Sequence, residues 1–95
     1  MANYAQLLAA LIAKQRSYPR VAELRRMQGR VEVQMRVGAD GRLTEARLSR
    51  TSGFEVLDRQ ALDMVRRAQP LPEPPDTLRG KEFLVNVPVL FQLEQ

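Results

Sequence analysis

Four acidic residues have side chains suited to acid–base chemistry: Asp40, Glu55, Asp58 and Asp63. Two carboxylates held close together could act as a general acid and a general base. Their surroundings point to structural roles instead. Asp40 lies in a Gly-Ala-Asp-Gly turn, and Glu55 follows Ser52 at the spacing of a helix capping box. Asp58 and Asp63 share a predicted helix with arginines, where such charges are usually solvated. We therefore predict no active site, and a protein that is not an enzyme.

The composition excludes other kinds of reactive site. The 95 residues include no cysteine and no histidine, so the usual ligands of zinc, copper and haem iron are missing. A Ser-His-Asp or Cys-His arrangement is excluded for the same reason. The sequence also has no run of about 18 apolar residues, the length that a membrane-spanning helix needs. We expect no metal and no cofactor.

The end of the chain has the pattern of a strand with one buried face. Apolar side chains recur at every second residue: Phe83, Val85, Val87, Val89, Phe91 and Leu93. Pro88 lies inside this run, and proline has no backbone N–H to donate to a neighbouring strand. Such a proline fits an edge strand on which the backbone groups of alternate residues point outward: Leu84, Asn86, Pro88, Leu90 and Gln92. The alternative is that Pro88 marks a bulge or the start of the strand. An exposed edge could accept a strand from another protein.

The remaining patterns predict the elements that position this strand. Helical spacing indicates a first helix from Asn3 to about Ser17, then a short helix from Pro19 that Gly29 ends. Two alternating strands follow, at 30–37 and 42–50, joined by a turn at 38–41. Because Leu43 is out of phase with the residues after it, we expect a β-bulge near residue 44 or 45.

A third helix from Ser52 and a proline-rich connector at 70–75 complete the order α-α-β-β-α-β. We predict an α+β fold, a three-stranded antiparallel sheet with helices packed on one face. The last strand should lie beside the first, which leaves its other side open. The chain is predicted to form one domain over 1–95, with an N-terminal helix at 1–17 and the core at 18–95.

Arginine accounts for all but two of the 15 basic residues, and the net charge is +4. A nucleic-acid surface is one interpretation of this charge. However, only five aromatic residues occur, and single-strand binders stack bases on exposed rings. Arginines also alternate with Glu32 and Glu45 across the predicted hairpin, as on a solvated sheet face. We therefore expect no nucleic acid as a partner and keep this interpretation as an alternative.

An ordered set of short motifs spans nearly the whole chain: Tyr18-Pro19, Gly29-Arg30-Val31-Glu32-Val33, Asp40-Gly41-Arg42-Leu43, Ser52-Gly53 with Leu57-Asp58 and Ala61, Leu71-Pro72-Glu73-Pro74-Pro75, and Val87-Pro88-Val89-Leu90-Phe91. Each motif is weak alone, but the ordered set is specific. With these motifs the chain resembles the C-terminal periplasmic domain of the TonB family, whose members energise outer-membrane transporters in Gram-negative bacteria. Met35 stands where the family often has phenylalanine.

The resemblance implies a function and a binding site. A short segment of the transporter, the TonB box, would lie along the last strand as an added strand, near the Tyr-Pro motif. The partner-binding residues would then be Ser17, Tyr18, Pro19, Arg20, Leu84, Asn86, Pro88, Leu90 and Gln92. The domain would transmit inner-membrane proton-motive energy for uptake of iron-siderophore, haem or similar substrates.

The resemblance also implies an anchor and a location. Family members carry an N-terminal membrane helix, which engages an ExbB/ExbD-type motor, and a Pro-rich spacer. Neither is present in these 95 residues, so we expect a periplasmic domain excised from a protein anchored in the inner membrane. A TolA-like envelope scaffold is the alternative within the same architecture, and a specialised paralogue such as HasB is equally compatible. Because exposed edges can pair with each other, we expect a monomer or a weak homodimer.

Overall fold

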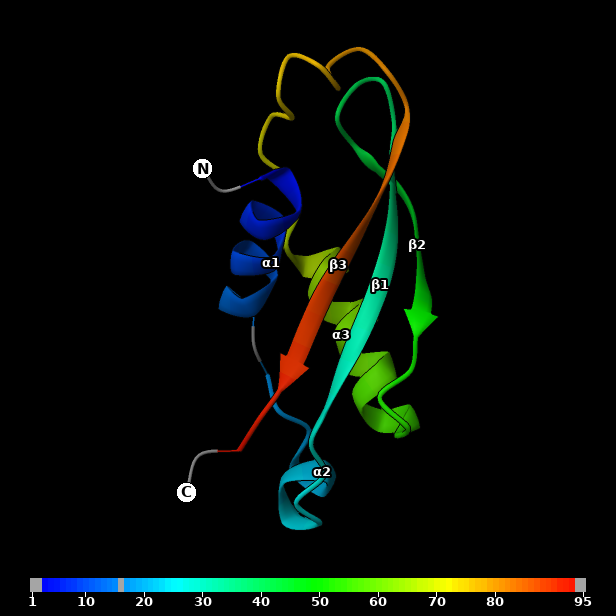
Figure 1. Ribbon diagram of the computed structural model, residues 1–95. Coiled ribbons are helices and arrows are strands. Elements are labelled where there is room, and N and C mark those ends of the chain that lie inside the picture. The colour runs from blue at the N-terminus through cyan, green and yellow to red at the C-terminus, as the bar shows by residue number, and fades with distance from the viewer. Residues whose placement is uncertain (1–2, 16, 94–95) are drawn as a thin grey trace.

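The computed structural model describes residues 3–15 and 17–93, which form a three-stranded antiparallel sheet with helices on one face (Figure 1). The elements are α1 (Tyr4–Lys14), α2 (Arg20–Leu24), β1 (Gly29–Val37), β2 (Leu43–Arg50), α3 (Glu55–Arg67) and β3 (Phe83–Phe91). The strands lie in the order β2-β1-β3, so β1 is central and the last strand lies beside the first. The predicted fold class is confirmed.

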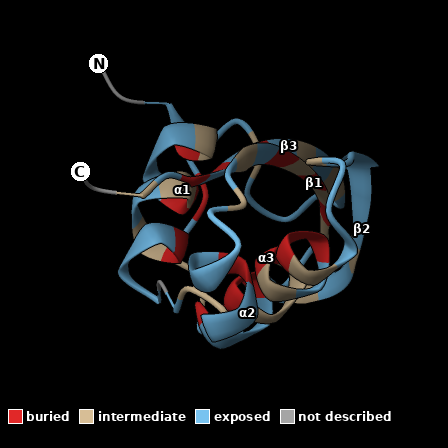
Figure 2. Ribbon diagram, turned by 90° about the horizontal axis from the view of Figure 1, so that it is seen from below, coloured by how far each residue is buried: buried red, intermediate tan, exposed pale blue. Residues whose placement is uncertain are grey.

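The core lies between the sheet and helices α1 and α3 (Figure 2). β1 supplies its centre, because four alternate side chains of this strand are fully buried: Val31, Val33, Met35 and Val37. The residues between them are polar and face away from the helices. This alternation is what a strand with a single covered face requires.

α1 begins at the predicted cap. The Asn3 side chain accepts a hydrogen bond from the Gln6 backbone N–H at 2.8 Å, and the Gln6 side chain accepts one from the Asn3 N–H at 3.2 Å. The helix ends at Lys14, earlier than the predicted end at Ser17. Its buried stripe packs onto β3 and α3: Tyr4, Leu8 and Ile12.

α2 is shorter than predicted. It ends at Leu24 because Arg26 adopts a positive φ of 54°, which takes the backbone out of the helical region. Gly29 was predicted to end this helix, but it is the first residue of β1. A Cβ added there would meet the Ser52 Cβ at 3.0 Å, so a close approach to the loop before α3 requires glycine.

β2 pairs irregularly with β1. A β-bulge occurs at Thr44, where the phase of the sequence predicted one, and a second bulge at Ser49 was not predicted. The hydroxyl of each bulged residue donates to a β1 carbonyl at 3.1 Å, Thr44 to Arg36 and Ser49 to Glu32. These two carbonyls therefore point toward β2.

The start of α3 differs from the predicted capping box. The helix begins at Glu55, Phe54 occupies the N-cap position, and no side chain caps it. The Ser52 hydroxyl instead donates to Asp58 Oδ1 at 2.8 Å, and the Ser52 backbone N–H donates to the same oxygen at 2.9 Å. The Thr51 hydroxyl donates to the other carboxylate oxygen. Asp58 has thus taken the Ser52 backbone N–H, from which the Glu55 side chain would accept in a capping box.

Asp58 is the clearest error among the predicted solvated charges, because its side chain is only 7% exposed. Burial by itself would raise the pKa of Asp58. The hydrogen bonds from Thr51 and Ser52 stabilise the carboxylate, and the net effect lowers that pKa. Asp58 therefore acts as an anion that ties the β2–α3 loop to the helix. Asp40 in the turn and Glu55 at the start of α3 are exposed, and Asp63 on α3 is half-buried and pairs with Arg67 at 2.9 Å.

Candidate functional site

β3 forms one edge of the sheet, and within the described residues no strand pairs with its outer side. Its pairing with β1 runs without a register shift from Gly29↔Phe91 to Val37↔Phe83. Pro88 faces Glu32 inside this regular ladder. The prediction of an edge strand is confirmed, and the alternative that Pro88 marks a bulge or a strand start is wrong.

The direction of each backbone group on β3 follows from β2. The Arg36 and Glu32 carbonyls accept hydrogen bonds from β2 hydroxyls, so even-numbered residues of β1 face β2. Alternate residues of a strand bond to opposite neighbours, and the odd-numbered residues of β1 therefore face β3. Their partners on β3 point inward: Phe83, Val85, Val87, Val89 and Phe91. The residues between them direct their backbone groups outward: Leu84, Asn86, Pro88 and Leu90. Gln92, predicted to belong to this set, follows the end of the strand at Phe91. Pro88 thus lacks an N–H where the sheet needs none.

The outer face of β3 presents apolar side chains next to these outward groups. Leu84 is 53% exposed and Leu90 is 59% exposed, although both are large aliphatic residues. Asn86 and Pro88 between them are also exposed. A strand added to this edge would therefore find backbone hydrogen-bonding groups and apolar surface together.

The Tyr-Pro motif lies at one end of this edge only. The Tyr18 ring stands edge-on to the buried Phe91 ring, with centroids 5.7 Å apart, and the Tyr18 hydroxyl donates to the Met27 carbonyl. Residues 17–20 therefore accompany the C-terminal end of β3. Leu84 lies seven residues from Phe91, roughly 23 Å along an extended strand. The structure thus brings Ser17–Arg20 near Gln92 but not near Leu84 and Asn86.

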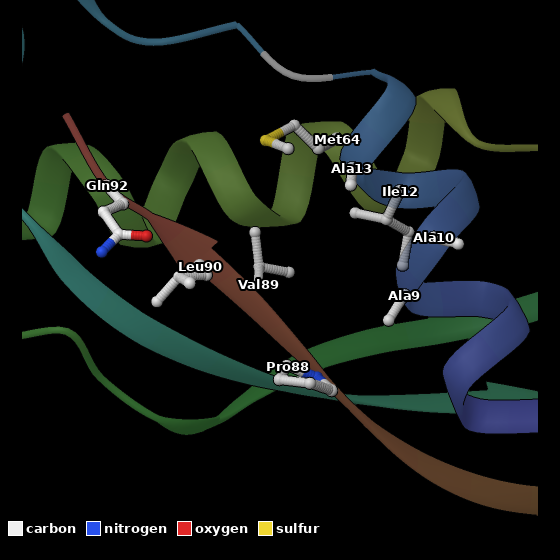
Figure 3. A pocket seen from close by; sticks show the side chains of 9 residues that line it. All are labelled: Ala9, Ala10, Ile12, Ala13, Met64, Pro88, Val89, Leu90 and Gln92. Carbon is white, nitrogen blue, oxygen red and sulfur yellow. The ribbon is translucent and has the colours of Figure 1, made fainter. Parts of the chain in front are cut away.

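A hollow of about 410 Å³ lies between α1 and the β3 edge (Figure 3). We call it the first hollow. Its walls are four residues of α1, Met64 of α3, three residues of β3 and Gln92 just after that strand: Ala9, Ala10, Ile12, Ala13, Met64, Pro88, Val89, Leu90 and Gln92. None of these side chains is charged. Sequence reasoning missed the α1 residues, because it treated that helix only as cover for the core.

A second hollow of about 560 Å³ lies near the start of β3. It is bounded by residues 3–5 and Leu7, by the connector residues Glu73, Pro75 and Leu78, and by residues 83–85. The Tyr4 ring packs edge-on against Phe83, with centroids 5.8 Å apart, and its hydroxyl donates to the Pro72 carbonyl at 2.8 Å. The two hollows thus lie on the same side of β3, each between α1 and the strand.

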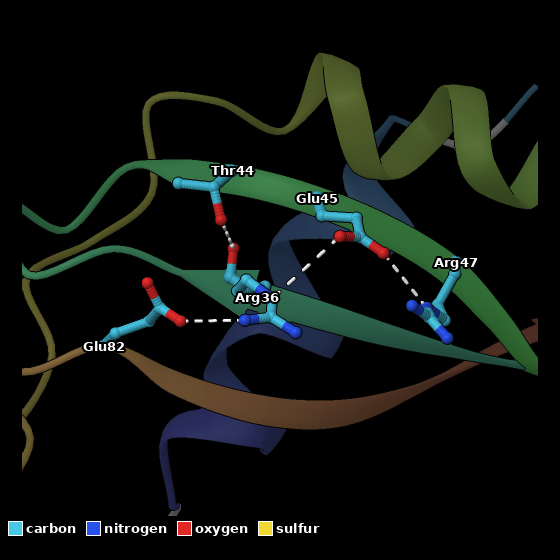
Figure 4. Close-up of polar contacts among 5 residues, drawn as sticks. All are labelled: Arg36, Thr44, Glu45, Arg47 and Glu82. Atoms are coloured by element: carbon cyan, nitrogen blue, oxygen red, sulfur yellow. Dashed lines mark hydrogen bonds and ion pairs between the residues drawn. The ribbon is translucent and has the colours of Figure 1, made fainter.

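On the outer face of the sheet, arginines are matched by acids (Figure 4). Arg36 Nη1 lies 2.8 Å from Glu82 Oε1, and Arg47 Nε lies 3.0 Å from Glu45 Oε1. This is the mixed-charge face that the sequence predicted. Most of the described arginines without an ion pair lie around α2 instead: Arg20, Arg25, Arg26 and Arg30.

Neither a metal site nor a membrane span is found in the described parts of the chain. Residues 3–15 and 17–93 contain no group of three or more acidic side chains placed to hold a metal ion. In these same two ranges, no helix is long and apolar enough to cross a bilayer. The open edge of β3, with its two hollows, is therefore the candidate site.

Fold and edge together define a small α+β domain whose last strand is an open edge of the sheet. Residues 14–93 match the family model described as "Gram-negative bacterial TonB protein C-terminal", and the chain belongs to this family. It is 40% identical over 65 residues to protein TonB of Haemophilus influenzae, an alignment covering 68% of this chain and 24% of that protein. It is 36% identical over 90 residues to protein TonB of Pasteurella multocida, covering 95% and 34%. The chain thus spans about a quarter to a third of these relatives' length.

Solved structures show the same fold. The solution structure of Helicobacter pylori TonB-CTD (residues 179–285) superposes with a TM-score of 0.80 at 22% identity, covering 93% of this chain and 78% of that one. The HasB CTD structure gives a TM-score of 0.61 at 25% identity, covering 99% and 72%. The prediction of a TonB-type C-terminal domain is confirmed.

Proposed function

We propose that this chain is the partner-binding module of a periplasmic energy-transducing protein, and that it captures the TonB box of outer-membrane transporters by strand addition at β3. The observation that carries this proposal is the continuous register of β3 on β1, which directs the backbone groups of Leu84, Asn86 and Leu90 away from the sheet. Membership of the TonB C-terminal family supports the choice of partner. No catalytic step is part of the proposal.

The proposal extends to the whole protein to which such a module would belong. An N-terminal membrane helix outside this chain would engage an ExbB/ExbD-type motor in the inner membrane. Proton-motive energy would reach the transporter through the bound segment and drive uptake of an iron-siderophore, haem or similar substrate. Residues 17–20 would contact the partner where it passes the C-terminal end of β3, since Tyr18 packs on Phe91 there.

Backbone hydrogen bonds alone would give a marginal complex. Three N–H groups and four carbonyls point outward between Leu84 and Leu90, and each hydrogen bond contributes about 1 kcal/mol net. Ordering a seven-residue partner segment costs about 1–2 kcal/mol per residue, which is as large or larger. Side-chain contacts must therefore supply the remaining affinity, and we expect micromolar or weaker binding.

A nuclear magnetic resonance titration tests the proposal. The probe is a synthetic peptide that copies the TonB box of a transporter encoded in the same genome. The amide signals of Leu84, Asn86 and Leu90 should shift more than those of Val85, Val87 and Val89, because only the first set gains hydrogen-bond acceptors. Shifts confined to the β2 edge, or no saturable shifts at millimolar peptide, would contradict strand addition at β3.

A further inference from the structure

We propose that the two hollows between α1 and β3 select the bound segment, each receiving one apolar side chain from the inner face of the added strand. The inference rests on the proposed strand addition and concerns its specificity. The partner would be an extended segment, without a folded core of its own, that carries two apolar side chains on one face.

The geometry of strand addition directs side chains into the hollows. An added strand would lie about 4.8 Å beyond β3, and its alternate side chains would point to the same two faces as those of β3. On the inner face, Val87 and Val89 of β3 are buried against the core on the side where α1 packs. The inner side chains of the added strand would therefore reach the space between α1 and the edge, where both hollows lie. Figure 3 shows the first of these two hollows.

The walls of the hollows define the chemistry of these two side chains. The residues that line the first hollow are apolar except Gln92, and none of them is charged. The second hollow has apolar residues such as Leu7 and Phe83 in its walls, and Glu73 is the only charged residue that lines it. A charged side chain that is buried in either hollow would lose its hydration, which costs free energy. In the first hollow no opposite charge would compensate for that loss. Aliphatic or aromatic side chains fit both.

The spacing of the two side chains can be bounded. Along β3, Leu84 in the second hollow and Leu90 in the first are six residues apart, roughly 20 Å. Along α1, Leu7 and Ala13 are also six residues apart, but only about 9 Å on a helix. The two hollows are therefore separated by between about 9 and 20 Å. Side chains on one face of a strand repeat at about 6.6 Å, so the two apolar residues of the bound segment should stand four or six positions apart.

A second copy of this chain is a poorer occupant of the hollows. If two β3 edges paired, the inner-face residues of the incoming strand would be Val87, Val89 and their neighbours, which are already buried in their own core. They could not enter the hollows without unfolding that core. A segment that is disordered before binding has the corresponding side chains free.

The test combines an alanine scan of the peptide with substitutions on α1. Replacing each peptide residue in turn by alanine should reveal two sensitive positions, four or six residues apart. Alanine at either position should raise the Kd roughly tenfold. Ala13→Leu should fill the first hollow and weaken the parent peptide by a similar factor. Ala13 is exposed at the surface of α1, so the fold should accept leucine there. Lys14→Leu is the matched control, because it adds the same side chain one residue away and lines neither hollow.

The decisive result is the coupling between the two changes. Against the peptide whose first-hollow residue is alanine, Ala13→Leu and the unsubstituted domain should bind equally. If the outward amides of β3 respond but Ala13→Leu behaves like Lys14→Leu, the hollows do not select the segment, and strand addition stands. If no peptide perturbs the β3 edge, the proposed function fails and this inference fails with it. Sedimentation showing that saturation of the edge requires a second copy would also overturn it.

Discussion

Replacing Leu90 by proline should weaken partner binding without unfolding the domain, whereas replacing Val89 by proline should damage the fold. The two residues are neighbours on β3, but their backbone groups point in opposite directions. Val89 faces Val31 of β1 and is 3% exposed, while Leu90 points its N–H away from the sheet and is 59% exposed. The same substitution thus removes an internal ladder bond at one position and an outward donor at the other.

The magnitudes differ enough to be measured. Val89→Pro loses one internal hydrogen bond and leaves a buried acceptor on β1 unsatisfied, which costs about 1–3 kcal/mol. The proline ring also fits the buried site of a valine poorly, at a further cost of about 1–3 kcal/mol, so the total of about 2–6 kcal/mol is a large part of the 5–15 kcal/mol that stabilises a typical domain. Leu90→Pro incurs neither cost, and we expect less than about 1 kcal/mol, equivalent to a melting temperature within roughly 4–8 °C of the parent. The missing donor should raise the Kd for the TonB-box peptide about fivefold.

Thermal unfolding followed by circular dichroism measures the first effect, and peptide binding by calorimetry or titration measures the second. Leu90→Ala is the control for loss of the exposed side chain, because it retains the backbone N–H. The reasoning is refuted if Leu90→Pro unfolds as readily as Val89→Pro, since β3 would then not be an edge in this register. It is equally refuted if Leu90→Pro folds and binds as tightly as Leu90→Ala.

Three further predictions concern parts of the molecule away from the outward groups of β3. Asp58→Ala should destabilise the domain by about 1–3 kcal/mol, because it leaves the donors of Thr51 and Ser52 unsatisfied; urea unfolding measures this. Because the folded-state pKa of Asp58 is lowered, its contribution to the free energy of unfolding is present above its unfolded-state pKa of about 3.9 and is lost as the pH falls below that value. Acid unfolding of the Asp58→Ala variant should therefore lack this pH-dependent loss of stability. Deleting residues 1–14 should expose the apolar surface that α1 covers and promote association, so an unchanged monomer in sedimentation would count against this role. Asp40→Ala should leave peptide affinity within twofold, since its carboxylate contacts Arg42 within the turn, through the Arg42 backbone N–H and guanidinium; loss of peptide binding in a folded variant would show that the site is misplaced.

Much of the fold could be predicted because the decisive signals are local. Alternation along 83–93 sets which face of β3 is buried, and Pro88 sets which of its sides is unpaired. The phase of Leu43 against the residues after it located the bulge at Thr44. Each of these signals comes from a strand's period of two, which a few neighbouring residues are enough to show.

The errors arise where a residue just outside a short motif competes with that motif. Ser52 and Glu55 have capping-box spacing, but the Ser52 hydroxyl binds Asp58, and the helix starts three residues later than Ser52. Gly29 has the residue type of a helix stop, but Arg26 ends α2 and Gly29 packs beneath the α3 loop.

The hollows were missed for a related reason. The apolar stripe of α1 shows which residues are buried, but not which strand they cover. Only the tertiary structure places this helix on the inner side of β3, so that its alanines stand beside the edge.

The two edges of the sheet are built differently, and this difference explains why a partner strand would add to β3 and not to β2. β2 carries bulges at Thr44 and Ser49, which interrupt its ladder and increase its twist, and charged side chains along its outer face. Bulges and charges are the usual means by which proteins prevent strands from adding to an edge. β3 has a ladder without interruption and exposed leucines, and Pro88 removes a single donor from the middle of the row. The missing N–H at Pro88 limits pairing with a further regular strand, including another β3. Donors remain on both sides of Pro88 for a short segment. We therefore expect this edge to accept a partner of a few residues and to resist extended self-association.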